Sequence, residues 1–274
     1  MINILYYLLI ALGINILMFI PAFIFKTDKL TDLSYSLTFI FLTLFALFRN
    51  DIHLRSIIIT TMVLLWAIRL GGFLLIRIFK SKKDKRFDGI RESFLKFLQF
   101  WSLQGLSVWI ILIPTLFFIN NQHNNVFWSG LFIWAFGLSF ETIADFQKFK
   151  FNKDPKNKGD FINVGLWRLS RHPNYFGEIL CWIGIYVFVF PILTLTQTLI
   201  GLISPIFIAS LLIFFTGIPK LEKYADKKWG KKKEYQRYKM NTNKLIPWIP
   251  KSKNEKSYSK KSQNEIKNKN LKEN

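Results

Sequence analysis

Residues 171–178 read Arg-His-Pro-Asn-Tyr-Phe-Gly-Glu and place two cations, an amide, a phenol and a carboxylate at the start of an apolar segment. Side chains of this kind cost about 2.5–3.5 kcal/mol each at membrane depth unless they are paired or line a wet cavity. Pro173 suits the first turn of a helix, whose free N–H groups attract anions. Asn174 and Glu178 are one turn apart and share a helix face. The cluster predicts a binding site, because a simple membrane anchor needs no such set of groups.

A second polar group ends the apolar run 126–144. Glu141 and Asp145 are one helical turn apart, and Gln147 and a basic stretch follow. Two carboxylates at this spacing face the same way. Asp145 alone is equally consistent with a helix end that meets water, but Glu141 lies deeper and indicates a site.

Charged and aromatic residues also occur in the runs before residue 80. Arg69 lies about two turns inside its apolar run, so we expect it to face the helix bundle or a carboxylate such as Glu141. Arg77 is nearer the loop and can extend to lipid headgroups. On pattern alone Trp66 is a core or lipid-facing residue and Asp32 a residue at the end of a span.

Five of the apolar runs that must position these groups are close to the roughly 20 residues that a helix needs to cross a bilayer, and the runs 30–48 and 175–190 are shorter. Seven such runs predict an all-α, polytopic membrane protein; they are residues 4–25, 30–48, 56–79, 94–119, 126–144, 175–190 and 198–218. We expect residues 1–250 to form the membrane domain and the Lys- and Asn-rich residues 251–274 to be a disordered tail.

The charge distribution predicts the orientation of the spans. The formal net charge is +21, and its lysines and arginines crowd residues 80–91, residues 148–171 and the C-terminus, whereas residues 120–125 and 191–197 have none. The positive-inside rule makes the basic segments cytoplasmic, which places the N-terminus outside after seven spans. This pattern predicts an integral protein of the bacterial inner membrane, or of the endoplasmic reticulum as the lesser alternative, rather than a nucleic-acid-binding protein.

Several chemistries are disfavoured by composition. Cys181 is the only cysteine and the three histidines are scattered, so we expect no metal site. Neither G-x-G-x-x-G nor G-x-x-x-x-G-K-[ST] occurs, which excludes a dinucleotide-binding Rossmann unit and a P-loop of the usual form. The polar clusters nevertheless share the cytoplasmic side. An anionic ligand from the cytosol would meet basic residues first, so the sequence predicts a nucleotide cofactor bound between helices.

Residues 165–178 (Gly-Leu-Trp-Arg-Leu-Ser-Arg-His-Pro-Asn-Tyr-Phe-Gly-Glu), together with Glu141-x-x-x-Asp145-x-Gln147 before them and Ile-Pro-x-x-Glu at 218–222 after them, resemble a known family. The pattern is similar to bacterial membrane proteins related to the steroid 5α-reductase C-terminal domain. The resemblance implies seven spans, NADPH in a cavity open to the cytosol, and reduction of a carbon–carbon double bond conjugated to a ketone.

The resemblance also implies roles for single residues. Asn174 and Glu178 would hold the nicotinamide, and Trp66 and Asp32 align with a tyrosine and a glutamate that lie near the ketone, which makes Glu178, Asp32 and Trp66 the candidate catalytic residues. An indole donates a hydrogen bond but delivers no proton, so a lipid-soluble enone is favoured over a classical steroid. We expect the cofactor to contact Arg77, Lys80, Arg86, Glu141, Asp145, Gln147, Lys150, Arg171, His172, Asn174, Tyr175, Glu178 and Glu222.

Two alternatives stay open. The Arg-His-Pro-x-Tyr-x-Gly string is also similar to isoprenylcysteine and phospholipid methyltransferases, which implies S-adenosylmethionine as the cofactor and the same Arg171, His172 and Tyr175 as its site. A non-enzymatic membrane scaffold or carrier is the second alternative, and it would leave the paired carboxylates without a purpose. Composition names neither the substrate nor the oligomeric state.

Overall fold

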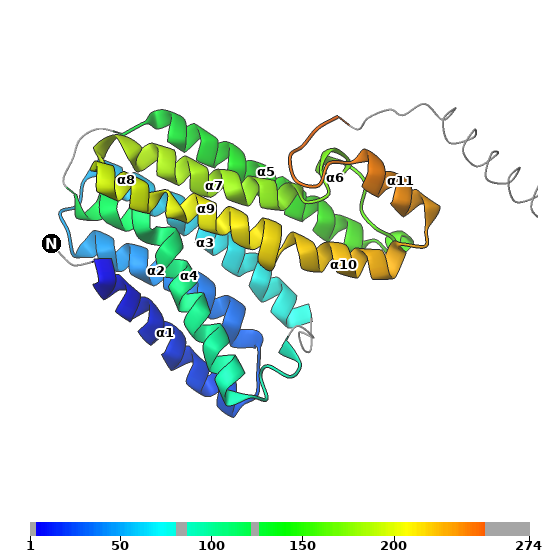
Figure 1. Cartoon of the computed structure of the whole chain (residues 1–274), viewed down its shortest axis with the longest axis horizontal. Helices are drawn as coiled ribbons and strands as arrows, with labels where there is room; N and C mark the ends of the chain where they lie inside the picture. The colour runs from blue at the N-terminus through cyan, green and yellow to red at the C-terminus, as the bar shows by residue number, and fades with distance from the viewer. Residues whose placement is uncertain (1–3, 81–86, 122–125, 250–274) are drawn as a thin grey trace, which may run out of the picture. The chain divides into compact units, whose positions relative to one another are not determined.

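The computed structural model describes residues 4–80, 87–121 and 126–249, apart from the side chains of residue 32 and residues 73–80. Within these ranges the protein is all-α, as predicted, and its extended backbone pairing is a single bridge between Ser170 and Asn243. The helices are α1 (Ile4–Ile24), α2 (Lys29–Phe48), α3 (Leu54–Lys80), α4 (Phe94–Asn120), α5 (Trp128–Lys153), α6 (Leu166–Leu169), α7 (Pro173–Val189), α8 (Leu195–Gly201), α9 (Ile203–Ser210), α10 (Ile218–Trp229) and α11 (Lys233–Asn241) (Figure 1).

Six helical segments of the described chain are long and apolar enough to cross a membrane. They are Ile4–Ile24, Lys29–Phe48, Leu54–Gly72, Phe94–Asn120, Pro173–Ile192 and Leu195–Trp229. The expected run at 126–144 forms α5, a helix of ample length that is less apolar because it carries Glu141 and Asp145. The protein is therefore an integral membrane protein with several apolar helices, and the crossing by α5 stays a prediction.

The chain separates into two compact units. The first, here called the bundle unit, comprises Met1–Thr142 and Gly177–Pro219. The second, here called the pocket unit, comprises Ile143–Phe176 and the chain from Lys220 onward. The bundle unit contains most of the apolar helices. The pocket unit contains two charged and aromatic segments, one before residue 177 and one after residue 219.

In the bundle unit α1 packs on α2 and α4, and α2 also packs on α3. The side-by-side course of α1, α2 and α4 can be followed in Figure 1. Asn15 joins these three helices: its side chain donates to Thr38 Oγ1 at 3.2 Å and accepts from Ser34 Oγ at 3.1 Å and Gln104 Nε2 at 3.0 Å. Buried polar bridges of this type hold helices together where apolar surface alone gives no preference between neighbours and lipid.

Within the bundle unit α5 and α7 approach closely through glycines spaced seven residues apart. These are Gly130 and Gly137 on α5 and Gly177 and Gly184 on α7. A Cβ added at Gly137 would lie 2.8 Å from Cys181 N, and one added at Gly177 would lie 2.6 Å from Glu141 N. Any side chain at these positions meets the backbone of the other helix, so the glycines fix the contact that holds Glu141 in place.

Candidate functional site

Glu141 has the partner that its depth requires. In the bundle unit Arg69 Nη2 donates to Glu141 Oε1, and the two side chains are 11% and 4% exposed. This pairing confirms the expectation from the position of Arg69. A buried charge is tolerated when it is paired, so each residue neutralises the other within the bundle unit.

Trp66 occupies the aromatic core of the bundle unit. Its side chain is fully buried, and its ring centroid lies 4.9 Å from that of Trp182 and 5.1 Å from that of Phe39, both in edge-to-face geometry. Trp66 Nε1 has no hydrogen-bond partner among the described residues. The structure thus gives Trp66 a packing role, and its catalytic role stays a prediction.

The motif at 165–172 lies in the pocket unit and is shaped by Gln147. Gly165 adopts φ +60°, and a Cβ there would come within 2.6 Å of the Gln147 side chain. Gln147 Oε1 accepts a hydrogen bond from Leu166 N at 2.9 Å, and Trp167 Nε1 donates to Ala144 O at 2.9 Å. Gln147 therefore holds the turn that presents the motif.

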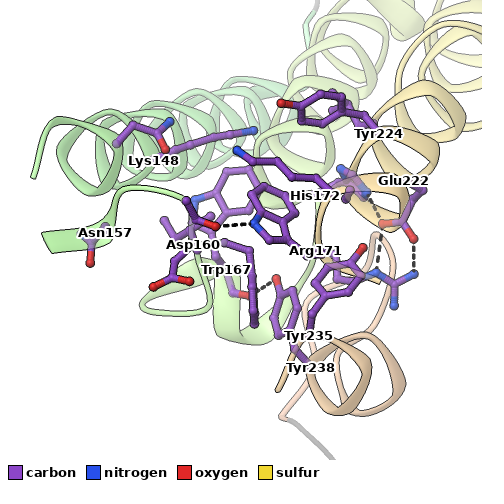
Figure 2. Close-up of a pocket in the computed structure, with 18 of the residues that line it drawn as sticks. Lys148, Asn157, Asp160, Trp167, Arg171, His172, Glu222, Tyr224, Tyr235 and Tyr238 are labelled. Atoms are coloured by element: carbon purple, nitrogen blue, oxygen red, sulfur yellow. Dashed lines mark hydrogen bonds and ion pairs between the residues drawn. The ribbon is translucent and has the colours of Figure 1, made fainter. Parts of the chain in front are cut away.

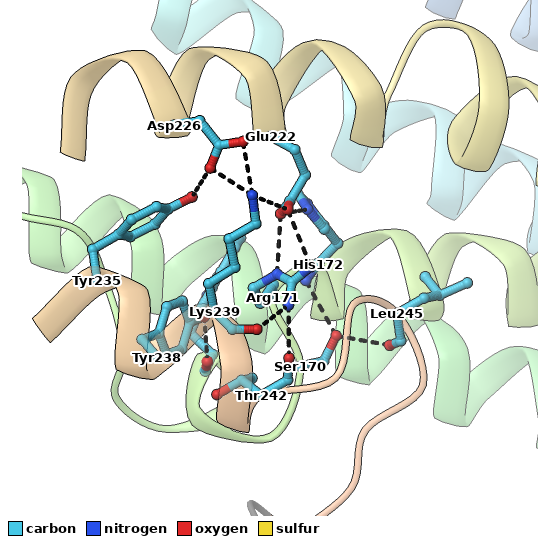
Figure 3. A network of polar contacts seen from close by, with 11 residues as sticks. Ser170, Arg171, His172, Glu222, Asp226, Tyr235, Tyr238, Lys239, Thr242 and Leu245 are labelled. Carbon is cyan, nitrogen blue, oxygen red and sulfur yellow. Dashed lines mark hydrogen bonds and ion pairs between the residues drawn. The ribbon is translucent and has the colours of Figure 1, made fainter. Parts of the chain in front are cut away.

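Arg171 makes four hydrogen bonds inside the pocket unit. Its Nε and Nη2 donate to the two carboxylate oxygens of Glu222, each at 3.1 Å, in the bidentate geometry that suits a guanidinium. Its Nη1 donates to the carbonyls of Lys239 at 2.7 Å and Thr242 at 2.8 Å. Figure 3 shows these contacts converging on one guanidinium. Arg171 therefore ties α10, α11 and the turn after α6 together.

His172 shares the same carboxylate. Its Nε2 lies 2.9 Å from Glu222 Oε1, and because an ionised carboxylate only accepts, Nε2 is the donor. Burial lowers the pKa of His172 from its usual value, against the opposing effect of Glu222, so the ring is neutral at pH 7. The buried Nδ1 is then an acceptor, with no partner in the described part of the chain. Tyr175 stacks on the same ring, with 5.8 Å between centroids.

The segment after α11 is strapped to this turn by backbone hydrogen bonds. Arg171 N donates to Asn243 O at 2.9 Å, and Trp248 N donates to Leu169 O at 3.0 Å. Ser170 Oγ also donates to Leu245 O at 2.7 Å. The C-terminal end of the described chain is thus part of the architecture of the site.

A pocket of about 430 Å³ opens beside Arg171 and His172 within the pocket unit (Figure 2). Its volume lies in the lower part of the roughly 300–1,000 Å³ range of small-molecule sites. Its lining is rich in aromatic rings and in basic groups. The aromatic residues of the lining are Phe161, Trp167, Tyr224, Trp229, Tyr235 and Tyr238, and the basic ones besides Arg171 and His172 are Lys148, Lys158 and Lys228.

Internal contacts hold the aromatic wall in place. Tyr238 Oη donates to Trp167 O at 2.6 Å, and Trp229 Nε1 donates to Gly159 O at 2.7 Å. Burial raises the pKa of Tyr235 to about 12, so its phenol stays protonated and donates to Asp226 Oδ1 at 3.3 Å. The rings of Trp229, Tyr235 and Tyr238 are therefore pre-oriented, with their polar groups bonded to the protein.

The structure brings together only part of the predicted set. Arg171, His172 and Glu222 meet at the pocket, whereas Asn174, Tyr175, Asp145, Gln147 and Lys150 are absent from its lining. Glu178 and Glu141 belong to the bundle unit. Arg86 lies outside the described residues, and so do the side chains of Asp32, Arg77 and Lys80.

Sequence reasoning missed the aromatic wall and Lys148. Trp229, Tyr235 and Tyr238 stand in a strongly charged segment, where large aromatic residues have no obvious core to fill. The presence of large aromatic residues in a charged segment was the signal that could have predicted an aromatic pocket. Trp167 was quoted as part of the motif, but the pattern assigned it no role.

Comparisons with known proteins give a family and a partial relative. A family model described as "Protein of unknown function (DUF1295)" matches residues 18–242. A probable O-methyltransferase, ustE, of Ustilaginoidea virens is 43% identical over 47 residues, which are 17% of this chain and 16% of that protein. No solved structure matches the chain.

Proposed function

This chain belongs to the DUF1295 family of membrane proteins, and from the chemistry of its pocket we propose that it is an S-adenosylmethionine-dependent methyltransferase acting on a lipid-soluble acceptor. The proposal concerns the cofactor, the reaction and the acceptor class.

One observation carries the proposal: Arg171 and His172 border a pocket of about 430 Å³ whose lining contains six aromatic residues. That volume suits a single nucleoside joined to an amino acid better than a dinucleotide. Aromatic faces can stack on a purine, and they attract an onium cation such as a sulfonium through the ring quadrupole. The partial similarity to a probable O-methyltransferase supports the same reaction class.

The donors and acceptors present also fit this cofactor. His172 Nδ1 is a buried acceptor with no partner among the described residues, and it can accept from a hydroxyl or an ammonium of the ligand. Glu222 fixes the tautomer that leaves Nδ1 as the acceptor. When bound, S-adenosylmethionine would supply an electrophilic methyl group. The chain's contribution is to bind and orient the cofactor and to exclude water with the aromatic wall.

An NADPH-dependent reductase is the second candidate, because Lys148, Lys158 and Lys228 along the lining could contact phosphates. Arg171 weakens this candidate. Four of its five N–H groups donate to Glu222 and two carbonyls, so its charge is already neutralised by the protein. The compact pocket also leaves the nicotinamide half of a dinucleotide without an evident place in this unit.

Ligand-dependent thermal unfolding of the detergent-purified protein tests the proposal. A ligand that binds only the native state at 100 times its Kd stabilises it by about 2.7 kcal/mol. We expect S-adenosylmethionine and S-adenosylhomocysteine to raise the Tm, and NADPH to leave it unchanged. Incubation with methyl-tritiated cofactor and a membrane lipid extract should then give organic-soluble label. A shift with NADPH and none with either adenosyl compound would overturn the proposal.

A further inference from the structure

Lys148 differs from the other basic residues around the pocket. Among the basic residues of the lining, Arg171 pairs with Glu222, whereas Lys158 and Lys228 are exposed to solvent and Lys228 Nζ lies 4.6 Å from the Trp229 ring centroid. Lys148 lines the pocket, yet within the described ranges its ammonium makes no ion pair, and its contact is with the face of Trp167, 4.6 Å from Nζ to the ring centroid. Figure 2 shows the Lys148 side chain beside the aromatic wall.

A partly buried cation that makes no ion pair is in an unfavourable state. Burial lowers the pKa of Lys148, and the field of Asp145 compensates in part. A cation–π contact returns about 0.5–2 kcal/mol, and a hydrogen bond from the ammonium to a charged group would add about 1.5–3 kcal/mol. An anionic ligand group at this position would therefore bind more favourably, because the Lys148 ammonium is already held there.

We infer that Lys148 seats the α-carboxylate of the amino-acid moiety of the cofactor, with Trp167 as the surface on which the lysine stem and ligand rest. This inference rests on the proposed function and adds to it the orientation of the cofactor, with its amino-acid end toward α5. Lys148 is a binding residue in this account and takes no part in bond making.

Lys150 provides a matched control. It lies two residues further along the same helix, is exposed, and is absent from the pocket lining. Lys148→Met and Lys150→Met remove the same charge from the same helix and keep a similar unbranched stem. A difference in ligand affinity between them therefore reports position and not net charge.

The experiment is isothermal titration of wild type and both variants with S-adenosylhomocysteine, which has the carboxylate, and with 5′-methylthioadenosine, which lacks the amino-acid part. We expect Lys148→Met to weaken S-adenosylhomocysteine at least about tenfold, as the loss of a charge-assisted hydrogen bond implies. Binding of 5′-methylthioadenosine should change less than about twofold, and Lys150→Met should match wild type for both ligands.

The outcomes separate this inference from the proposed function. Equal weakening of both ligands by Lys148→Met would overturn the carboxylate seat and leave the methyltransferase proposal standing. Failure of wild type to bind either ligand would sink the proposed function itself. Loss of NADPH binding in Lys148→Met, with no adenosyl binding in wild type, would assign the ammonium to a phosphate instead.

A second measurement uses only the wild-type protein and compares two ligands. Wild type should bind decarboxylated S-adenosylmethionine about tenfold more weakly than S-adenosylmethionine, because only the carboxylate differs. Equal affinity of wild type for the two compounds would contradict the seat even if Lys148→Met failed to fold.

Discussion

Each unit of this protein contains an Arg–Glu pair with little solvent exposure, and the two pairs differ in their surroundings. In the bundle unit Arg69 meets Glu141 through one guanidinium nitrogen. In the pocket unit Arg171 donates to both carboxylate oxygens of Glu222 and to two backbone carbonyls, and His172 contacts the same carboxylate. An arginine–glutamate pair therefore neutralises a buried charge in the bundle unit, whereas in the pocket unit it positions the turn that carries Arg171 and His172.

The largest expected effect comes from breaking the helix contact that holds Glu141. Gly137→Leu would place a side chain against the backbone of α7, where even a Cβ lies 2.8 Å from Gly177 O. Because backbone cannot yield, we expect a loss of more than about 3 kcal/mol and little folded protein on size-exclusion chromatography in detergent. Gly13→Leu on α1 is the control, since a Cβ at Gly13 has no atom within 4 Å. Equal yields of the two variants would argue against the glycine contact.

The next effect concerns the bundle pair itself. Glu141→Ala removes the carboxylate from a largely buried guanidinium, so we expect thermal unfolding to report a loss of about 3–5 kcal/mol. The double variant Arg69→Met with Glu141→Met removes both charges and should be less destabilised than Glu141→Ala. If the double variant were the worse of the two, the pair would do more than neutralise charge.

The pocket pair should be less costly to break because it is more accessible, with side chains 12% and 15% exposed. For Glu222→Ala we expect about 2 kcal/mol, between the values for exposed and fully buried pairs. Hydrogen exchange should show the loss in the turn at 169–172 and the strap at 242–248, with the bundle helices unchanged. Uniform loss of protection over both units would contradict a local positioning role.

The smallest effect is the pH dependence contributed by His172. Its pKa is lowered by burial in the folded state, so the unfolded state binds more protons as pH falls below about 6.5. Stability should therefore be complete above that pH and decline as pH drops toward the lowered native pKa. His172→Gln should flatten the wild-type dependence of Tm between pH 7.5 and 5.5. An identical slope in the variant would remove His172 from the account.

Composition and spacing predicted the all-α fold and the pairing of Arg69 with Glu141. Both follow from one strong constraint, since apolar runs of membrane length must be helical and a deep charge must find a counter-charge. The sequence also listed Arg171, His172 and Glu222 among the cofactor contacts; the structure places the three side chains together, and their binding of a cofactor stays a prediction.

The aromatic wall was beyond sequence reasoning because its members are separated by tens of residues. Trp167 and Tyr238 meet only through the fold, by a hydrogen bond across 71 positions. Hydrophobic periodicity identifies residues that share a face of one helix, and it does not detect contacts between residues far apart in the sequence. For the same reason the sequence pattern listed Arg171 as a cofactor contact without predicting its pairing with Glu222.

The most direct test of the central claim is ultraviolet cross-linking of methyl-tritiated S-adenosylmethionine to the purified protein, followed by mapping of the labelled peptides. The account predicts label in peptides from 148–172 or 221–238, competed by S-adenosylhomocysteine and not by NADPH. Label confined to other segments, or label displaced by NADPH alone, would contradict a cofactor site in the aromatic pocket.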